Sequence, residues 1–187
     1  PLRYWREGGF PQGISKAIDK LGYQNPSPIQ RQAIPALHGA RQDIIGIAET
    51  GSGKTAAFLV PLLCHMSTME ASILSKCSEE GPVGLVIAPT RELAIQIEQD
   101  CRSLAQFTAF KSTCLVGGES IDAQIATLRA SSVHVVVGTP GRLADCVDNN
   151  YMVLNQCQYV VLDEADKMVD MGFEAALTAI LDSIPGA

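Results

Sequence analysis

The sequence predicts an α/β domain in which helices cover both faces of a parallel β-sheet. Short apolar segments of four to six residues alternate along the chain with longer amphipathic segments. Apolar residues make up 47% of the 187 residues and aromatic residues only 5%, so the core must consist mainly of aliphatic side chains, as in buried parallel strands. Together these observations favour a doubly wound sheet.

Five segments are expected to form the strands, because each is a short apolar run bounded by turn residues. They are 43–48, 83–88, 112–116, 133–137 and 159–162. Five segments with helical spacing of apolar residues are expected to form helices. They are 55–65, 91–107, 121–130, 141–148 and 172–183. Ligands of such sheets bind beyond the carboxyl ends of the strands, so residues that directly follow a strand are the first candidates for a site.

Two segments fall outside this alternation. Residues 1–38 precede the first predicted strand, and we expect a helix over 11–21 and a break at Pro26 and Pro28. Residues 67–82 are polar and rich in turn formers, so they are expected to form a surface loop. The chain begins with Pro rather than Met, which suggests an excised piece of a longer protein.

The charge balance limits how this chain can bind nucleic acid. The formal net charge is −6 and the pI is near 5.0, whereas proteins that hold phosphates by bulk charge are usually basic. Phosphates can also be bound by helix N-termini and a few placed arginines, so we expect weak non-specific RNA affinity without excluding a specific site. No apolar run approaches the roughly 18 residues of a membrane helix, and no membrane contact is expected.

The six cysteines are scattered, without a CxxC pair or a Cys/His cluster. They are Cys64, Cys77, Cys101, Cys114, Cys146 and Cys157. This spacing argues against a zinc site and against a disulfide framework. We therefore expect buried or half-buried free thiols in a reducing compartment, and the three isolated histidines receive no chemical role.

The segment 48–55, AETGSGKT, joins the first predicted strand to the first predicted helix. In this place glycines let backbone N–H groups surround a phosphate, Lys54 brings charge to the β- and γ-phosphates, and Thr55 offers a hydroxyl to Mg²⁺. Ala48 stands where the pattern GxxxxGK[ST] begins with Gly. The alternative is a glycine-rich turn with a chance lysine, and the strand before and helix after favour the phosphate loop.

The segment 163–166, DEAD, closes the last predicted strand. Asp163 can hold Mg²⁺ through its water shell, and Glu164 can orient or deprotonate an attacking water. The alternative is a solvated acidic turn that begins a helix, where the helix dipole favours Asp and Glu. The presence of Lys54 and Thr55 in the same chain favours the catalytic interpretation.

The strings DEAD and AETGSGKT together resemble the DEAD-box family of ATP-dependent RNA helicases. Other family motifs follow in order: GYQNPSPIQ at 22–30 resembles the Q motif, PTRELA at 89–94 motif Ia, the doublet at 117–118 the GG motif, and TPGRL at 139–143 motif Ib. The resemblance covers essentially the whole chain. It implies a RecA-like P-loop NTPase domain spanning 1–187, with 1–38 as the Q-motif region and ATP and Mg²⁺ as cofactors.

The resemblance also implies how the nucleotide is bound. Gln30 can present its amide to the N6 and N7 edge of adenine, and Tyr23 can pack on the base. Ser27 stands where the family has Thr, and Trp5 where Phe is usual. The implied ATP-binding residues are Trp5, Tyr23, Ser27, Gln30, Ala48, Thr50, Gly51, Ser52, Gly53, Lys54 and Thr55. The alternatives are a capping turn at Ser27 and simple edge packing of Trp5.

On the RNA side, the resemblance implies contacts with the sugar–phosphate backbone of single-stranded RNA. The implied residues are Pro89, Arg91, Gly118, Thr139 and Arg142. Such contacts carry no base information, so binding independent of RNA sequence is expected. The alternative for Arg91 and Arg142 is pairing with nearby carboxylates such as Glu92 or Asp145.

The family's second RecA-like domain is expected to be missing from this chain. No SAT triplet and no HRxGR string occur, so Asp166, which couples to the SAT triplet in the family, lacks that partner. A missing arginine finger alone lowers the rate by roughly 10³–10⁵. We therefore expect Mg-ATP binding but negligible ATPase and no unwinding by these residues alone.

Within the family, strings such as YVVLDEADKMVDMGFE are similar to those of a spliceosomal member that acts at the 5′ splice site. This implies spliceosomal proteins as partners and a nuclear location, with the cytoplasm as the alternative; a monomer is expected. The alternative within the family is a DEAD-box helicase of another RNA pathway. Two other classes stay open: a P-loop enzyme of another kind, such as a DNA helicase or nucleotide kinase, or a binding module without catalysis. Gln30 argues against the first, and intact Lys54 and Glu164 argue against the second.

Overall fold

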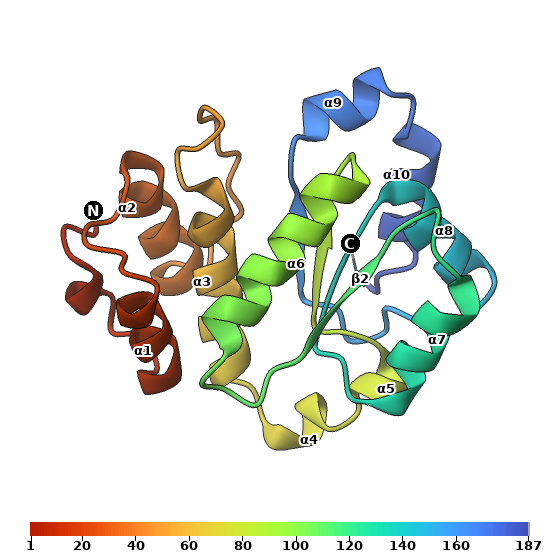
Figure 1. Cartoon of the computed structure of the whole chain (residues 1–187), viewed down its shortest axis with the longest axis horizontal. Helices are drawn as coiled ribbons and strands as arrows, with labels where there is room; N and C mark the ends of the chain where they lie inside the picture. The colour runs from red at the N-terminus through yellow and green to blue at the C-terminus, as the bar shows by residue number, and fades with distance from the viewer. Residues whose placement is uncertain (187) are drawn as a thin grey trace. The chain divides into compact units, whose positions relative to one another are not determined.

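The computed structural model describes residues 1–186, which divide into two compact units. The first unit contains Pro1–Met69 and Asp100–Ala109, and the second contains Glu70–Gln99 and the chain from Phe110 onward. Figure 1 shows the course of the chain through both.

The second unit is built on a four-stranded parallel sheet. Its strands are β1 (Gly84–Ile87), β2 (Ser112–Leu115), β3 (Val135–Gly138) and β4 (Tyr159–Leu162), in the order β2-β3-β1-β4. In the register, Leu85 of β1 lies beside Val136 of β3 and Val160 of β4. Four of the predicted strands are thereby confirmed, and their carboxyl ends lie at one edge.

Helices connect these strands and cover both faces of the sheet. They are α4 (Ala71–Leu74), α5 (Cys77–Glu80), α6 (Arg91–Ala105), α7 (Ile121–Ala130), α8 (Pro140–Asp148), α9 (Ala165–Asp170) and α10 (Glu174–Asp182). The residues of α6 from Asp100 onward belong to the first unit. Leu85 and Val136 point to the face on which α8 and α10 lie side by side (Figure 1). Val86 and Val137 alternate to the opposite face and are also fully buried. Burial on both faces confirms the doubly wound prediction.

The first unit is helical. It contains η1 (Trp5–Gly8), α1 (Gln12–Lys20), α2 (Pro28–Ile34), η2 (Pro35–Gly39) and α3 (Lys54–Ser67). The prediction of a helix near 11–21 is confirmed by α1, and that of a helix near 55–65 by α3. Ile14, Ile34, Leu59 and Leu62 are fully buried in its core, where α2 packs against α3.

The predicted strand at 43–48 is not formed. Ile45 is 94% exposed and Ile47 is 93% exposed, and within residues 1–186 no backbone–backbone hydrogen bond involves this segment. An apolar β-branched run favours extended backbone, but a strand needs a neighbour for its N–H and C=O groups. The sequence reports the preference for extended backbone but not the presence of a neighbouring strand. Within residues 1–186 the sheet therefore has four strands rather than five.

The prediction of a plain surface loop at 67–82 is also wrong, because this segment contains α4 and α5. Cys77 is buried, and the Gln156 amide donates to Gly81 O at 2.7 Å and to the Cys77 sulfur at 3.2 Å. Gly81 has φ +87°, and a Cβ there would collide with Val153 O. A polar composition therefore concealed an ordered segment anchored through one cysteine and one glycine.

The cysteine thiols are free, five of them buried and Cys114 half-buried. Burial raises the pKa of Cys64 to about 12. At Cys114, burial and then the charges of Glu98 and Glu119 raise the thiol pKa to about 12. Within residues 1–186, no helix combines the length and the hydropathy of a membrane span.

Candidate nucleotide and RNA sites

The phosphate-loop segment is shaped by two glycines in the left-handed region. Gly51 has φ +79° and Gly53 has φ +89°, a conformation that L side chains rarely adopt. Gly53 precedes the first residue of α3, and a Cβ there would collide with the Gln30 amide and approach Ser27 Oγ at 3.0 Å. The last glycine of AETGSGKT is therefore required by both its backbone angle and its neighbours.

Lys54 closes this loop on itself. Its ammonium nitrogen donates to Ala48 O at 2.7 Å, so the first and seventh positions of the motif are joined by one charge-assisted hydrogen bond. Lys54 and Thr55 are both half-buried at the start of α3. A phosphate that took the ammonium would have to replace a neutral carbonyl, which is the weaker partner for a positive charge.

Gln30 is 6% exposed and contacts the phosphate loop. Its Oε1 accepts from the Ser27 N–H at 2.8 Å, and its Nε2 donates to Gly53 O at 3.0 Å. The alternative interpretation, a capping turn at the start of α2, is thus present, and the same amide also holds the loop. Adenine recognition by Gln30 stays a prediction; beyond these two hydrogen bonds the amide still has one N–H donor and one acceptor lone pair.

Three buried polar side-chain atoms have no hydrogen-bond partner within residues 1–186: Trp5 Nε1, Ser27 Oγ and Ser52 Oγ. Leaving such a group without a partner costs about 1–3 kcal/mol. Two of these atoms belong to the Q-motif turn and the phosphate loop. The donor set therefore fits an oxygen-rich ligand such as a nucleotide phosphate, which would satisfy hydroxyl donors that the protein leaves unused.

Trp5 belongs to an aromatic cluster in the first unit. Its ring lies 5.9 Å from the Tyr23 ring and 6.2 Å from the Phe10 ring, centroid to centroid. Burial, and then the charge of Asp100, raise the pKa of Tyr23. Packing of Trp5 was the alternative to a base contact, and the cluster shows that packing; Phe10 was missed because an isolated Phe in the sequence gives no signal.

The DEAD segment begins directly after β4. The Asp163 N–H donates to Ile87 O at 2.9 Å, which ties this residue to the sheet. Glu164 has φ +51°, and its N–H donates to Asp163 Oδ1 at 3.1 Å. A non-glycine residue in the left-handed region costs of order 1–3 kcal/mol and is concentrated at functional sites. Lys167, which the sequence did not single out, lies 3.6 Å from Glu164 Oε2.

The remaining predicted residues lie at the same carboxyl edge of the sheet. Asp166 is exposed in the first turn of α9, and its Oδ1 accepts from the Lys167 N–H at 2.9 Å. Pro89 is buried after β1. Thr139 precedes α8, and its N–H donates to Leu115 O at 3.1 Å.

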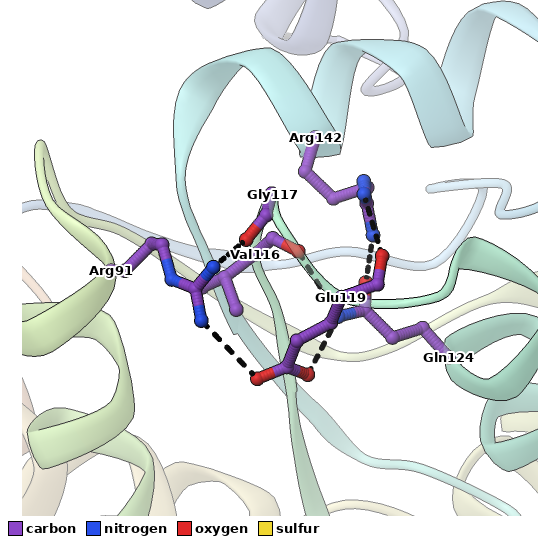
Figure 2. A network of polar contacts seen from close by, with 6 residues as sticks. All are labelled: Arg91, Val116, Gly117, Glu119, Gln124 and Arg142. Carbon is purple, nitrogen blue, oxygen red and sulfur yellow. Dashed lines mark hydrogen bonds and ion pairs between the residues drawn. The ribbon is translucent and has the colours of Figure 1, made fainter.

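Arg91 is held by the loop that follows β2 (Figure 2). One guanidinium nitrogen donates to Gly117 O at 2.6 Å, and the other lies 3.6 Å from Glu119 Oε1. Gly118 between them has φ +77°, and a Cβ there would collide with the guanidinium. The pairing alternative for Arg91 is therefore realised, but with Glu119 rather than with Glu92.

Arg142 joins the same network. Its Nη1 donates to Gln124 Oε1 at 2.6 Å, and its Nη2 donates to Glu119 O at 3.1 Å. The alternative for Arg142 named a carboxylate such as Asp145; the partners in the structure are instead an amide and a carbonyl. Glu119 and Gln124 were missed because neither belongs to a recognised motif; the position of Glu119 directly after the GG doublet was the available signal.

The structure brings the predicted residues together in two groups. Gln30, Ser27 and the 48–55 loop are in contact within the first unit. Arg91, Gly118 and Arg142 share one network within the second unit, whose sheet edge also carries 163–166. Lys54 and Thr55 belong to one unit, and Asp163 and Glu164 to the other.

Comparison with known proteins identifies the relatives of this chain. A family model described as DEAD/DEAH box helicase matches residues 27–186. The chain is 50% identical over its full length to "ATP-dependent RNA helicase ddx23" of Dictyostelium discoideum, covering 22% of that protein. It is 48% identical over 99% of its length to "Pre-mRNA-splicing ATP-dependent RNA helicase PRP28" of Gibberella zeae, covering 25% of it. The chain therefore spans about a quarter of the length of these relatives.

Solved structures agree with these relatives. The RNA helicase Prp28 from Chaetomium thermophilum bound to ADP superposes with a TM-score of 0.86 at 46% identity, over 97% of this chain and 43% of that one. The yeast DEAD-box splicing factor Prp28 gives 0.87 at 36% identity, over 100% and 44%. These neighbours confirm the RecA-like fold, and the chain belongs to the DEAD/DEAH box helicase family.

Proposed function

We propose that this chain is the ATP-binding RecA-like domain of an ATP-dependent RNA helicase, which binds Mg-ATP and the backbone of single-stranded RNA. The observation that carries the proposal is the hydrogen bond from the Gln30 amide to Gly53 O in the phosphate loop, at 3.0 Å. The residue proposed to recognise adenine and the loop proposed to bind the phosphates are thereby one connected site. A generic phosphate loop has no need of that connection.

The roles of the chain's own residues follow from their chemistry. Lys54 exchanges Ala48 O for the β- and γ-phosphates, and Thr55 contributes its hydroxyl to the metal site. Asp163 would hold Mg²⁺ through its water shell, and Glu164 would orient or deprotonate the attacking water. Mg²⁺, when bound, neutralises the charge that develops on the phosphates. Glu164 is engaged by Lys167 at 3.6 Å, so this ion pair must open before the carboxylate can accept a proton.

Nucleotide binding is tested by calorimetric titration of the chain with Mg-ADP and with Mg-GDP. The comparison is repeated on Gln30→Ala, and on Gln32→Ala, an exposed glutamine of the same helix, as the matched control. If Gln30 recognises adenine, the alanine variant loses affinity for ADP more than for GDP. If it only holds the loop, both affinities fall equally. Equal wild-type affinity for ADP and GDP would refute adenine recognition.

We also propose that a second RecA-like domain completes the ATPase site, so that residues 1–187 alone turn over ATP negligibly. The relatives that this chain resembles are about four times its length, since it covers 22–25% of them, which leaves room for such a domain. Phosphate release is to be measured with and without RNA for this chain and for a chain extended by the following domain. RNA-stimulated turnover by the short chain would contradict the proposal.

We place the protein in pre-mRNA splicing, with spliceosomal partners and a nuclear location. The support is that several relatives are named as splicing helicases, among them PRP28 of Gibberella zeae at 48% identity and the yeast splicing factor Prp28 at 36%. The test replaces the matching region of the yeast protein with this chain. Growth and normal levels of spliced mRNA are expected, and accumulation of unspliced precursor with a stably expressed chimera would count against the assignment.

A further inference from the structure

Gln124 is the buried polar centre of the network drawn in Figure 2. It lies in α7 and is 7% exposed. Its Nε2 donates to Val116 O at 3.1 Å and to Glu119 Oε2 at 3.2 Å, while its Oε1 accepts from Arg142 at 2.6 Å. Two acceptors on one side and a guanidinium on the other fix the orientation of the amide. No other neutral side chain of this length supplies a donor and an acceptor in these places.

Glu119 contacts both arginines. Its Oε1 lies 3.6 Å from Arg91, its Oε2 accepts from Gln124, and its backbone O accepts from Arg142 at 3.1 Å. Arg91 follows β1 and Arg142 follows β3, which are neighbouring strands. Through Glu119 and Gln124 the two guanidinium groups therefore form one connected structure rather than two independent surface side chains.

The two connections have opposite consequences for an anionic ligand. Gln124 holds Arg142 through a neutral oxygen, so the guanidinium is fixed without losing its charge. A free arginine side chain carries about 2 kcal/mol of rotamer entropy, and holding it beforehand lowers the cost of binding. Glu119 instead brings a carboxylate to Arg91, and a carboxylate competes with a phosphate for the same fork of donors.

On the premise of the RNA site proposed above, we infer that Gln124 is a positioning residue for Arg142, and that the Glu119 carboxylate takes the place of an RNA phosphate on Arg91. A phosphodiester that reaches this edge meets a guanidinium already aligned by Gln124. It then displaces Glu119 from Arg91, while the Glu119 carbonyl keeps its bond to Arg142. Gln124 and Glu119 together set how tightly the chain holds an RNA backbone.

The test is fluorescence anisotropy of the full chain with a labelled oligouridylate, at a series of salt concentrations. Gln124→Met keeps the length of the side chain and removes its polar atoms; we expect about three- to ten-fold weaker binding, the net size of one typical hydrogen bond. The slope of log K against log salt should shrink by about 0.7, the value for one phosphate contact on a single strand. Gln96→Met, on the exposed face of α6, is the matched control and should change neither quantity.

Glu119→Gln tests the second half of the inference. Its side chain is half exposed, so folding is not at risk. Removing the charge should strengthen RNA binding about two- to five-fold at low salt, as expected for an exposed ion pair that no longer competes. Unchanged or weaker binding would overturn the role given to this carboxylate.

A double-mutant comparison separates positioning from a general structural effect. If Gln124 acts through Arg142, Gln124→Met should have no further effect in an Arg142→Ala background. A full additional loss would overturn the inference, as would an unchanged salt slope. Gln124→Asn, which keeps both polar groups on a shorter chain, serves if the Met variant does not fold, and should bind RNA more weakly than wild type. Thermal unfolding is recorded for every variant.

Failure of the premise looks different from failure of the inference. If Arg91→Ala and Arg142→Ala leave RNA affinity unchanged, the RNA site itself is wrong. If both weaken binding while Gln124→Met does not, the RNA site stands and only the positioning role is lost.

Discussion

The phosphate-loop segment (residues 48–55) and the proposed RNA edge, the edge of the sheet that carries Arg91, Glu119, Gln124 and Arg142, are held together in different ways. Residues 43–55 have no ladder hydrogen bonds, exposed Ile45 and Ile47, and a loop held by Gln30 and by Lys54. At the RNA edge, the segments that follow β1, β2 and β3 carry Arg91, Glu119 and Arg142, which Gln124 of α7 joins into one closed network. The phosphate-loop segment is thus held by a few side-chain hydrogen bonds, whereas the RNA edge directly follows hydrogen-bonded strands of the sheet.

The difference extends to what a phosphate must displace. At Lys54 the partner to be displaced is a neutral carbonyl oxygen, whereas at Arg91 it is the carboxylate of Glu119. Displacing a charged group from a guanidinium is more costly than displacing a dipole. On the proposed roles, we therefore expect tighter binding of phosphate at the loop than at the RNA edge, and RNA binding that weakens with salt, in keeping with the net charge of −6.

The largest expected effect contrasts one isoleucine from each region. Ile87→Ala, in the fully buried strand β1, should lower the free energy of unfolding by about 2–5 kcal/mol. Ile45→Ala, at 94% exposure, should change it by no more than about 0.5 kcal/mol. Urea unfolding followed by circular dichroism gives both values. A loss above about 2 kcal/mol at Ile45, as for a core residue, would mean that this segment is packed in solution.

The next effect tests whether the proposed nucleotide site and the proposed RNA site act independently. Lys54→Ala should weaken Mg-ADP binding about 10- to 100-fold, the range expected for one hydrogen bond to a charged group. RNA affinity in the absence of nucleotide should stay unchanged, because the RNA edge lies in the other unit. Lys16→Ala, an exposed residue of α1, is the control. Titration calorimetry and anisotropy measure the two affinities, and a parallel loss of both would show that the regions are not independent.

A third comparison uses glycines of the second unit. Gly118→Ala forces an alanine into φ +77° and against Arg91, which should cost about 1–2 kcal/mol of stability. Gly141→Ala, with no atom within 4 Å of its Cβ position, should stay within about 0.5 kcal/mol of wild type. Thermal unfolding distinguishes them. Equal stability of the two variants would remove the strain argument at the GG doublet.

The smallest effect is on the pH dependence of stability, and its sign differs between the units. Burial, and then the charge of Lys111, lower the pKa of His134 in the folded chain. As the pH drops, the unfolded chain therefore protonates this histidine first, and the free energy of unfolding falls through about pH 6.5. Burial raises the pKa of Asp100, so its contribution is lost as pH rises above its ordinary range near 4. The free energy of unfolding of His134→Gln and of Asp100→Asn, measured from pH 4 to 7, checks both effects. A His134→Gln curve that parallels wild type would reject the effect assigned to His134.

Much of the fold could be predicted because burial and periodicity agree along the chain. The runs at β1 and β3 are continuous, apolar and buried, which is how strands covered on both faces appear in sequence. The run at 43–48 has the same composition and yet forms no strand. Composition reports that an extended backbone is favoured, whereas pairing depends on a distant partner.

The site was predicted where chemistry is local and missed where it is not. Lys54, Gln30, Arg91 and Arg142 lie in contiguous motifs, and each is positioned at a loop or helix start as expected. Their partners are distant in sequence: Gln30 contacts Gly53, and Arg142 contacts Gln124. A single sequence cannot show that a glutamine in the middle of a helix faces a guanidinium, because nothing in its spacing distinguishes it from a solvated residue.

The buried cysteines have a practical consequence for spectroscopy. Thiols whose pKa is raised to about 12, such as Cys64 and Cys114, carry almost no thiolate at neutral pH, and thiolate is the form that maleimides attack. A new cysteine placed at exposed Ser120 would therefore react far faster than Cys64 or Cys114. A fluorophore could then be attached beside the GG doublet in the otherwise unaltered chain, to report RNA binding without a cysteine-free background.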